Sequence, residues 1–375
     1  MSKRYILLIV LLIIYIVFLQ KYYINNNNIE IGNKMLIDDE EKPISFLLFI
    51  DNIDTYYIAK DEIFDISKYK NNIIKYYSLD NNIASIDNNG LIKGNNIGNT
   101  TITGFDNSNN KYMIKIVVTN LLVKPEYNLN KKTITCKYYS EEDAHLLDKI
   151  LDIRVKSAGE SSRGALLETA RFLTLSLPVK IPYFFENGRL ENHEGQSYVD
   201  GEGRYYHKGL YLSTDKYKDI KASFSGPQIW GCPLTNYDDT YGWKIGAKYP
   251  NGLDCSGFVT WALYNSGIDV SDIGAGISEK TLDLSDIGEK HNITYSYVNS
   301  NNYHVGDIIA IFGHSALIVG KDNKYLYIAE SLRHGVRVEK YNYTNKNSSL
   351  YTNYSYIETL DNLYNDNTNY EDMWD

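Results

Sequence analysis

Cysteine is scarce, with only Cys136, Cys232 and Cys255 among 375 residues. Three thiols are too few for a framework of disulfides, so at least one of them is either an unreactive core residue or a reactive one. We interpret Cys136 and Cys232 as incidental or unreactive, and keep a disulfide between them as the less favoured alternative in an exported protein. Cys255 is then the candidate for chemistry.

Positive charge is also in short supply. The chain carries 38 Lys and Arg against 47 Asp and Glu, a formal net charge of −9. A nucleic-acid-binding protein needs a surplus of cationic side chains to neutralise phosphates, so we expect no nucleic-acid partner. The hydrophobic content of 43% and the length indicate a globular protein of two or three domains.

Histidines at metal-ligand spacing are absent too. The sequence has no HExxH motif and no cluster of Cys and His with the spacing of a metal site. We therefore expect neither a metal nor a cofactor. The histidines considered are His145, His193, His207, His291 and His304.

The amino terminus has the pattern of an export signal. Lys3 and Arg4 precede an apolar run over residues 5–19. The run is followed by Lys21 and two tyrosines with no small-residue cleavage site, which favours an uncleaved anchor over residues 1–24. We expect the rest of the chain to be extracytoplasmic and held at the membrane, or secreted if the signal is cleaved.

Short strands separated by turn residues follow over residues 44–119. Ile114, Ile116 and Val118 alternate with Met113, Lys115 and Val117, which predicts one buried face. The segment 78–103, with its Asn- and Gly-rich turns, resembles the bacterial immunoglobulin-like repeat of cell-surface proteins. Such a module implies a spacer that holds the next domain off the membrane, and an adhesive role stays open as the alternative.

After the strands, the spacing of apolar residues changes to the period of a helix. After a linker at residues 120–139, Ser140 is a plausible N-cap for a helix over residues 141–156, and a second helix is predicted over residues 162–177. Both helices are expected to pack in the core. The irregular stretch at residues 186–251 is interpreted as an insertion that faces substrate.

Cys255 and His314 fall where a thiol and a base can meet. The string Leu253-Asp-Cys-Ser-Gly-Phe258 puts Cys255 at the start of a helix, where the macrodipole favours a thiolate. His314 opens a strand over residues 314–320 after another strand over residues 305–312, so it can face the helix. The next strand offers Glu330, which could orient the imidazole.

These motifs together resemble the NlpC/p-sixty family of bacterial cell-wall cysteine peptidases. The resemblance rests on Lys180-Ile-Pro-Tyr-Phe184, the Cys255 string, Gly306-Asp-Ile-Ile309 and Gly313-His-Ser-Ala-Leu-Ile-Val-Gly320, and covers roughly residues 161–343.

The resemblance implies an α+β papain-like fold, with Cys255 as nucleophile and His314 as base. It also implies that Tyr183, Asp254 and Ser256 bind substrate. The family most often has a histidine in the third catalytic position. Here we assign that role to Glu330, with His334 as a second candidate.

The whole chain is predicted to be multidomain. An N-terminal membrane segment and an all-β immunoglobulin-like sandwich precede an α+β papain-like domain over residues 140–345, and an extension follows over residues 346–375. The expected function is that of a peptidoglycan hydrolase, a cysteine endopeptidase that cleaves the amide between the D-glutamate γ-carbonyl and the diamino acid of stem peptides.

Two other functions stay open. The same pair could serve an amidase that cuts between glycan and L-alanine, and an adhesin could carry an inactive papain-like domain. The expected partners are stem peptides and the membrane, and the sequence leaves the oligomeric state open. Fast alkylation of Cys255 below pH 7 would favour an enzyme over an adhesin.

Overall fold

The structure is a computed structural model. It describes residues 54–127, 130–184, 191–192, 208–215, 220–221, 224–237, 244–270, 273, 287–300 and 302–366, all of which belong to one compact unit. The predicted anchor at residues 1–24 lies outside these residues. Within them, none of the helices has the length and apolar character that a bilayer span requires.

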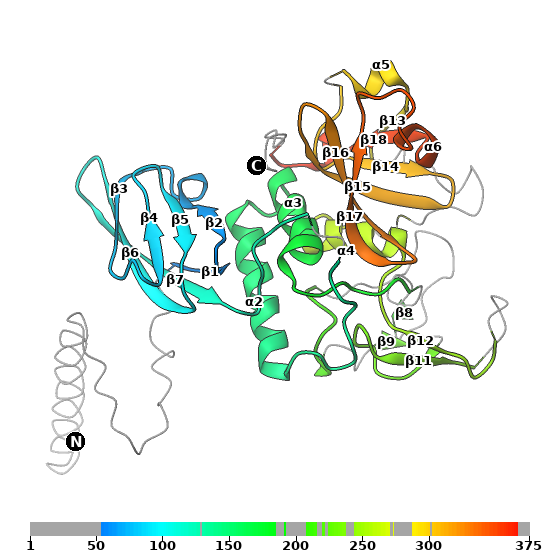
Figure 1. Cartoon of the computed structure of the whole chain (residues 1–375), viewed down its shortest axis with the longest axis horizontal. Helices are drawn as coiled ribbons and strands as arrows, with labels where there is room; N and C mark the ends of the chain where they lie inside the picture. Colours follow the sequence, from blue (N-terminus) through cyan, green and yellow to red (C-terminus); the bar gives the residue numbers. More distant parts are fainter. Residues whose placement is uncertain are drawn as a thin grey trace, which may run out of the picture. The chain divides into compact units, whose positions relative to one another are not determined.

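The first described region is a β-sandwich (Figure 1). One sheet has the strand order β1-β7-β6-β3 and the other the order β2-β5-β4. β1 pairs with β7 in parallel, whereas the other pairs are antiparallel. The elements are β1 (Asp54–Ala59), β2 (Ile63–Asp65), the 3-10 turn η2 (Ile66–Lys68), β3 (Ile73–Ser78), β4 (Ala84–Ile86), β5 (Leu91–Gly94), β6 (Gly98–Asp106) and β7 (Lys111–Thr119).

The predicted alternation in β7 is confirmed. Ile114, Ile116 and Val118 are buried between the sheets, whereas Met113 on the other face is 41% exposed. Successive side chains of a strand point to opposite faces, so the sequence pattern fixes which face forms the core.

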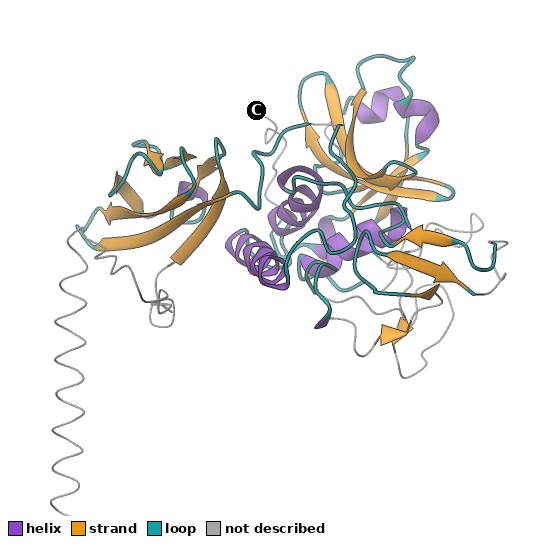
Figure 2. Ribbon diagram, turned by 60° about the horizontal axis from the view of Figure 1, so that its bottom comes forward, coloured by secondary structure: helices purple, strands orange, loops and turns teal. Residues whose placement is uncertain are grey.

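The remainder is a mixed α/β region around a six-stranded antiparallel sheet of order β13-β18-β14-β15-β16-β17. Helices α3 and α4 pack against β15, and Figure 2 shows helices beside this sheet. The sheet strands are β13 (Glu289–Asn292), β14 (Ile308–Ile311), β15 (His314–Lys321), β16 (Tyr325–Leu332), β17 (Gly335–Asn342) and β18 (Tyr356–Thr359).

The helices of this region begin where the sequence indicates. Ser140 and Ser162 cap α2 and α3 by accepting hydrogen bonds from the N–H groups of Asp143 and Ala165. The second predicted helix is divided, because α3 ends at Arg171 and a π-helical turn, η3, completes it. The elements are α2 (Glu141–Ser157), α3 (Arg163–Arg171), η3 (Phe172–Ser176), α4 (Cys255–Asn265), α5 (Tyr295–Val298), α6 (Leu350–Asn353) and the 3-10 turn η5 (Asp361–Leu363).

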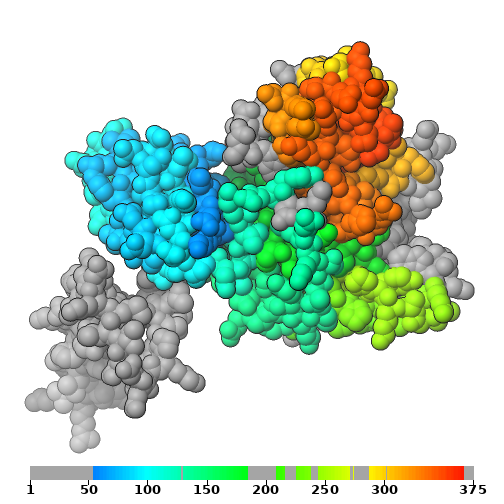
Figure 3. All heavy atoms as spheres, viewed as in Figure 1, coloured from blue at the N-terminus to red at the C-terminus, as the bar shows by residue number. Residues whose placement is uncertain are grey.

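The stretch predicted as an irregular insertion contains short strands. They are β8 (Glu191–Asn192), β9 (Ile220–Lys221), β10 (Phe224–Ser225), β11 (Pro233–Asn236) and β12 (Lys248–Pro250). β10, β11 and β12 form a small antiparallel sheet. The segment around β11 and β12 is coloured yellow-green in Figure 3, at the surface of the molecule.

The predicted linker at residues 120–139 is tied to the α/β region. Lys131 is half-buried, and its Nζ donates to the carbonyl oxygens of Thr174, Leu175 and Leu177 at 3.1, 2.6 and 2.6 Å. These carbonyls lie at the end of η3, where a helix has acceptors without partners, so the ammonium caps this end. Burial lowers the pKa of Lys131 to about 8.

A buried ion pair joins the sandwich to α2. Arg154 Nη2 lies 3.1 Å from Glu62 Oε1, and both side chains are less than a tenth exposed. The same guanidinium donates to the carbonyl oxygen of Tyr57. Ile153, the neighbour of Arg154, packs against the sandwich core. The contact therefore combines charge pairing with apolar burial.

Candidate active site

Helix α4 places Cys255 at its first residue. Asp254 is the N-cap, and its Oδ1 accepts from the N–H of Gly257 at 2.6 Å. Cys255 is buried, with 6% of its surface exposed. The prediction that Cys255 opens a helix is confirmed, and its sulfur lies where the positive end of the macrodipole stabilises an anion.

Asp254 and Ser256, predicted to bind substrate, are each 3% exposed. The carboxylate of Asp254 is committed to the helix cap, and the Oγ of Ser256 lies 3.4 Å from the same carboxylate. Their position next to Cys255 fits the resemblance, and their role toward substrate stays a prediction.

The segment that carries Tyr183 runs beside the residues that precede Cys255. The N–H of Leu253 donates to Pro182 O at 3.1 Å, and the N–H of Phe184 donates to Leu253 O at 3.2 Å. Gly252 permits this approach, because a Cβ there would overlap the carbonyl of Pro182. Tyr183 is 41% exposed, and its role toward substrate stays a prediction.

His314 stands at the first position of β15, as predicted. The β14–β15 hairpin turns through Phe312 and Gly313, and Gly313 has a φ of +81°, which a glycine adopts without strain. Cys255 Sγ lies 3.9 Å from the carbonyl oxygen of Gly313, and the thiol interacts electrostatically with the imidazole of His314, whose buried Nδ1 has no hydrogen-bond partner among the described residues. The turn thus brings the ring to the sulfur.

Glu330 on β16 holds the other side of the imidazole. Nε2 of His314 lies 2.9 Å from Oε2 of Glu330, so this nitrogen donates to the carboxylate. Nδ1 is the ring nitrogen that remains for the thiol. The structure therefore brings together Cys255, His314 and Glu330, the three residues predicted to be catalytic.

The charges of this group depend on one another. Burial acts to lower the pKa of His314, but the interactions with Cys255 and Glu330 raise it to about 9. Burial acts to raise the pKa of Glu330, but the hydrogen bond and charge of His314, with help from Tyr354 and Arg337, hold it below its ordinary value. At neutral pH the imidazolium form of His314 therefore predominates beside the Glu330 carboxylate.

His334, the second candidate for the third position, lies elsewhere. It is exposed in the turn between β16 and β17, and its Nε2 accepts from Arg333 Nε at 3.1 Å. The hydrogen-bonding position on His314 belongs to Glu330.

Two residues of the site had no signal in the sequence. Tyr354, just after α6, donates its hydroxyl to Glu330 Oε2 at 2.8 Å, and Arg337 on β17 donates to Glu330 Oε1 at 3.2 Å. Both are common residue types in segments without a motif. The pairing of β16 with β17 brings Arg337 to Glu330, and the tertiary fold brings Tyr354 there.

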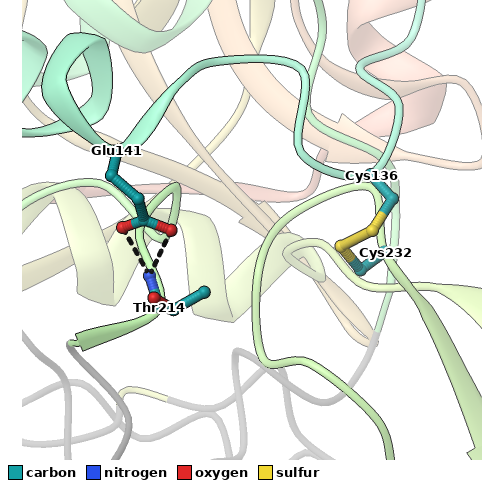
Figure 4. The surroundings of a disulfide bond; sticks show 4 residues. All are labelled: Cys136, Glu141, Thr214 and Cys232. Atoms are coloured by element: carbon teal, nitrogen blue, oxygen red, sulfur yellow. Dashed lines mark hydrogen bonds between the residues drawn. A yellow bond between two sulfur atoms is a disulfide. The ribbon is translucent and has the colours of Figure 1, made fainter.

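The interpretation of Cys136 and Cys232 as incidental is wrong. They form a disulfide that links the predicted linker to the residues before β11, across a sequence separation of 96 (Figure 4). The neighbouring Trp230 packs its ring 5.9 Å from that of Trp261 on α4. The bond therefore fastens a segment that supports the Cys255 helix.

One cluster of side chains in the described residues has the composition of a metal site. Ligand atoms of Glu141, His145 and Asp215 all lie within 4.8 Å of one another, and all three residues are exposed. The Glu141 carboxylate also accepts from the N–H of Thr214 (Figure 4). A cation that prefers nitrogen and oxygen ligands could be held here. No local sequence signal marks this group, because Asp215 lies 70 positions after His145.

Comparison with known families identifies the fold of the first region. Residues 61–117 match the family model of the bacterial Ig-like domain (group 2). This segment is a bacterial Ig-like domain. The match confirms the resemblance noted for residues 78–103.

The α/β region has no such match. No NlpC/p-sixty family model matches it. A search of curated proteins found no similar sequence. The peptidase resemblance of residues 161–343 therefore rests on the motifs and on the geometry around Cys255.

Proposed function

We propose that the protein is a cysteine endopeptidase that hydrolyses peptidoglycan, cleaving the amide between the D-glutamate γ-carbonyl and the diamino acid of stem peptides. The observation that carries the proposal is the convergence of the Cys255 thiol, the His314 imidazole and the Glu330 carboxylate, with Nε2 of His314 2.9 Å from Glu330 Oε2. A thiol at a helix start, an imidazole and a buried carboxylate are the parts that nucleophilic amide hydrolysis needs. The choice of the scissile bond comes from the family resemblance.

The reaction would proceed in two stages. The Cys255 thiolate adds to the carbonyl carbon, and the backbone N–H of Cys255 stabilises the oxyanion. The carbon–nitrogen bond then breaks as the His314 imidazolium protonates the departing amine. In the second stage His314 takes a proton from water, the hydroxide adds to the thioester, and the acid product leaves with the thiolate restored.

Two further features fit a protein outside the cytoplasm. The disulfide between Cys136 and Cys232 persists in oxidising compartments, and the predicted signal at residues 1–24 would direct the chain there. In this proposal the Ig-like domain is the spacer that separates the peptidase from the membrane.

The test is hydrolysis of purified cell wall by the full chain and by Cys255→Ala. We expect the wild type to release peptides whose free amino terminus is the diamino acid, leaving L-alanyl-D-glutamate on the glycan, and the variant to release none, because the nucleophile is gone. An unchanged melting temperature of the variant is the control for folding. Retained activity would refute the role of Cys255, and mass spectra with free L-alanine amino termini would reassign the enzyme as an amidase.

A further inference from the structure

The carboxylate of Glu330 is buried, with 1% of its side chain exposed, and both of its oxygens accept hydrogen bonds. A buried carboxylate stays ionised only when charges or donors replace the water that it has lost. His314 supplies one donor. The two other donors come from elements that the proposed reaction does not otherwise use.

Tyr354 is fixed against both Glu330 and His314. It is 2% exposed, and its hydroxyl donates to Oε2, the oxygen that also accepts from His314. Its ring centroid lies 5.8 Å from that of His314 and 5.7 Å from that of Tyr341, which meets it edge to face. With its ring packed on two sides, Tyr354 keeps its hydroxyl oxygen at hydrogen-bonding distance from Glu330.

Arg337 faces Glu330 directly across the β16–β17 ladder. Its Nη2 reaches Glu330 Oε1 at 3.2 Å, and its Nε lies 2.8 Å from Glu339 Oε1 on the same strand. The guanidinium therefore neutralises two carboxylates while Glu339 restrains its position. A cation at this place favours the ionised form of Glu330.

We propose that Tyr354 and Arg337 are positioning residues that keep the Glu330 carboxylate ionised and directed at His314, an inference that rests on the proposed function. The groups that face this carboxylate are His314 from β15, Arg337, Glu339 and Tyr341 from β17, and Tyr354 after α6. Cys255 on α4 faces the other side of His314. Each donor that is removed leaves the charged form of Glu330 less stable.

The first experiment compares Tyr354→Phe with Tyr356→Phe in the full chain. Tyr356 is a matched control, because its hydroxyl is also buried but finds no hydrogen-bond partner in the described part of the chain. Carbon-13 NMR of labelled glutamate side chains follows the titration of Glu330, assigned by the signal that Glu330→Gln loses. We expect Tyr354→Phe to raise the pKa of Glu330 by about one pH unit and Tyr356→Phe to leave it unchanged.

The second experiment removes the cation. Arg337→Gln should raise the pKa of Glu330 in the same direction, and Arg337→Lys should restore part of the effect, because it keeps the charge. Arg333→Gln removes a charge from the nearby β16–β17 turn and should leave the pKa unchanged. For wall hydrolysis, the acid limb of the pH profile should move to higher pH in the Tyr354 and Arg337 variants, whereas a purely structural defect would lower the rate equally at every pH.

The outcomes separate the two proposals. If the pKa of Glu330 is the same in Tyr354→Phe, Tyr356→Phe and the wild type, the positioning roles are wrong, even if the wild type hydrolyses the wall. If the wild type hydrolyses no wall while the titration of Glu330 moves as expected, the proposed function fails and the positioning of the carboxylate stands. The melting temperature of each variant shows whether it folds.

Discussion

The Ig-like domain and the α/β region bury different kinds of side chain. Among the described residues of the sandwich, Glu62 is the single buried charged residue. The α/β region buries many more, which are Arg154, Arg163, Arg171, Asp254, Asp307, Glu330 and Glu358. The core of the Ig-like sandwich is therefore almost wholly apolar, whereas the core of the α/β region also contains charged side chains, several of them in ion pairs.

Buried charge alone does not mark the active site. Arg163 is fully buried and pairs with Asp307 at 2.9 Å, and Arg171 donates to the carbonyl oxygen of Val319. These contacts join α3 to the sheet and are structural. Glu330 differs because its partner His314 also contacts a thiol, so the chain of contacts rather than burial identifies the site.

The largest expected effect comes from making the same change to a buried carboxylate in each region. Glu330→Gln removes one of the two groups that raise the pKa of His314, so this pKa should fall from about 9 toward its ordinary value of 6.5. Wall hydrolysis should drop about a hundredfold, with the alkaline limb of its pH profile moved to lower pH. Initial rates between pH 5 and 10 measure this.

Glu62→Gln is the matched control in the sandwich, because Glu62 is also a buried carboxylate paired with an arginine. This variant should keep the wild-type pH profile. If both variants change the profile alike, the contrast between the two regions fails.

The next effect concerns the stability of the contact between sandwich and α2. Arg154→Met leaves the Glu62 carboxylate buried without its cation, which should cost about 3 kcal/mol or more of unfolding free energy. Urea denaturation measures the loss. The double variant Glu62→Leu with Arg154→Met should regain much of it, because no unpaired charge remains. A single variant as stable as the wild type would show that the pair contributes nothing.

Removal of the disulfide should have a somewhat smaller effect. Cys136→Ser with Cys232→Ser frees a loop closed over a separation of 96 residues, and we expect a loss of about 2–4 kcal/mol. Thermal melting of the variant and of the reduced wild type should agree. A reductant that lowers the melting temperature of the double variant further would point to a different cause.

The smallest expected effect is the loss of stability when an exposed ion pair is removed, and it should be similar in both regions. Lys70 pairs with Asp54 on the sandwich, and Lys156 pairs with Asp152 on α2, with half or more of each carboxylate exposed. Lys70→Met and Lys156→Met should each change stability by less than about 1 kcal/mol, because water screens exposed pairs. Denaturation in 1 M salt should abolish even this difference.

Local patterns predicted much of this molecule. The alternation in β7, the Ser140 cap of α2 and the position of Cys255 at the start of α4 follow from neighbours in sequence, and the structure confirms each of them. His314 at the start of β15 and Glu330 on β16 were predicted from strand order alone, since adjacent strands of a meander pair with each other.

Contacts between distant segments could not be predicted in this way. The parallel pairing of β1 with β7, the disulfide and the placement of Tyr354 against Glu330 each join residues whose local sequences carry no sign of the partner. Three cysteines allow three different disulfide pairings, and the sequence does not favour any one of them. Arg337 meets Glu330 only because the β16–β17 turn sets that register.

The backbone bonds of Leu253 with Pro182 and Phe184 bear on how the chain tolerates changes in length. These bonds hold the residues around 183 beside residue 253, and the added entropy of closing a longer loop between two fixed points grows only slowly with its length. Tyr211 and Trp230 between these points are fully buried in the core, so a change in length is tolerated where it leaves their packing and the disulfide of Cys232 intact. If the proposed function holds, variation elsewhere in this segment is a route by which the choice of cell wall can change without moving Cys255 or His314.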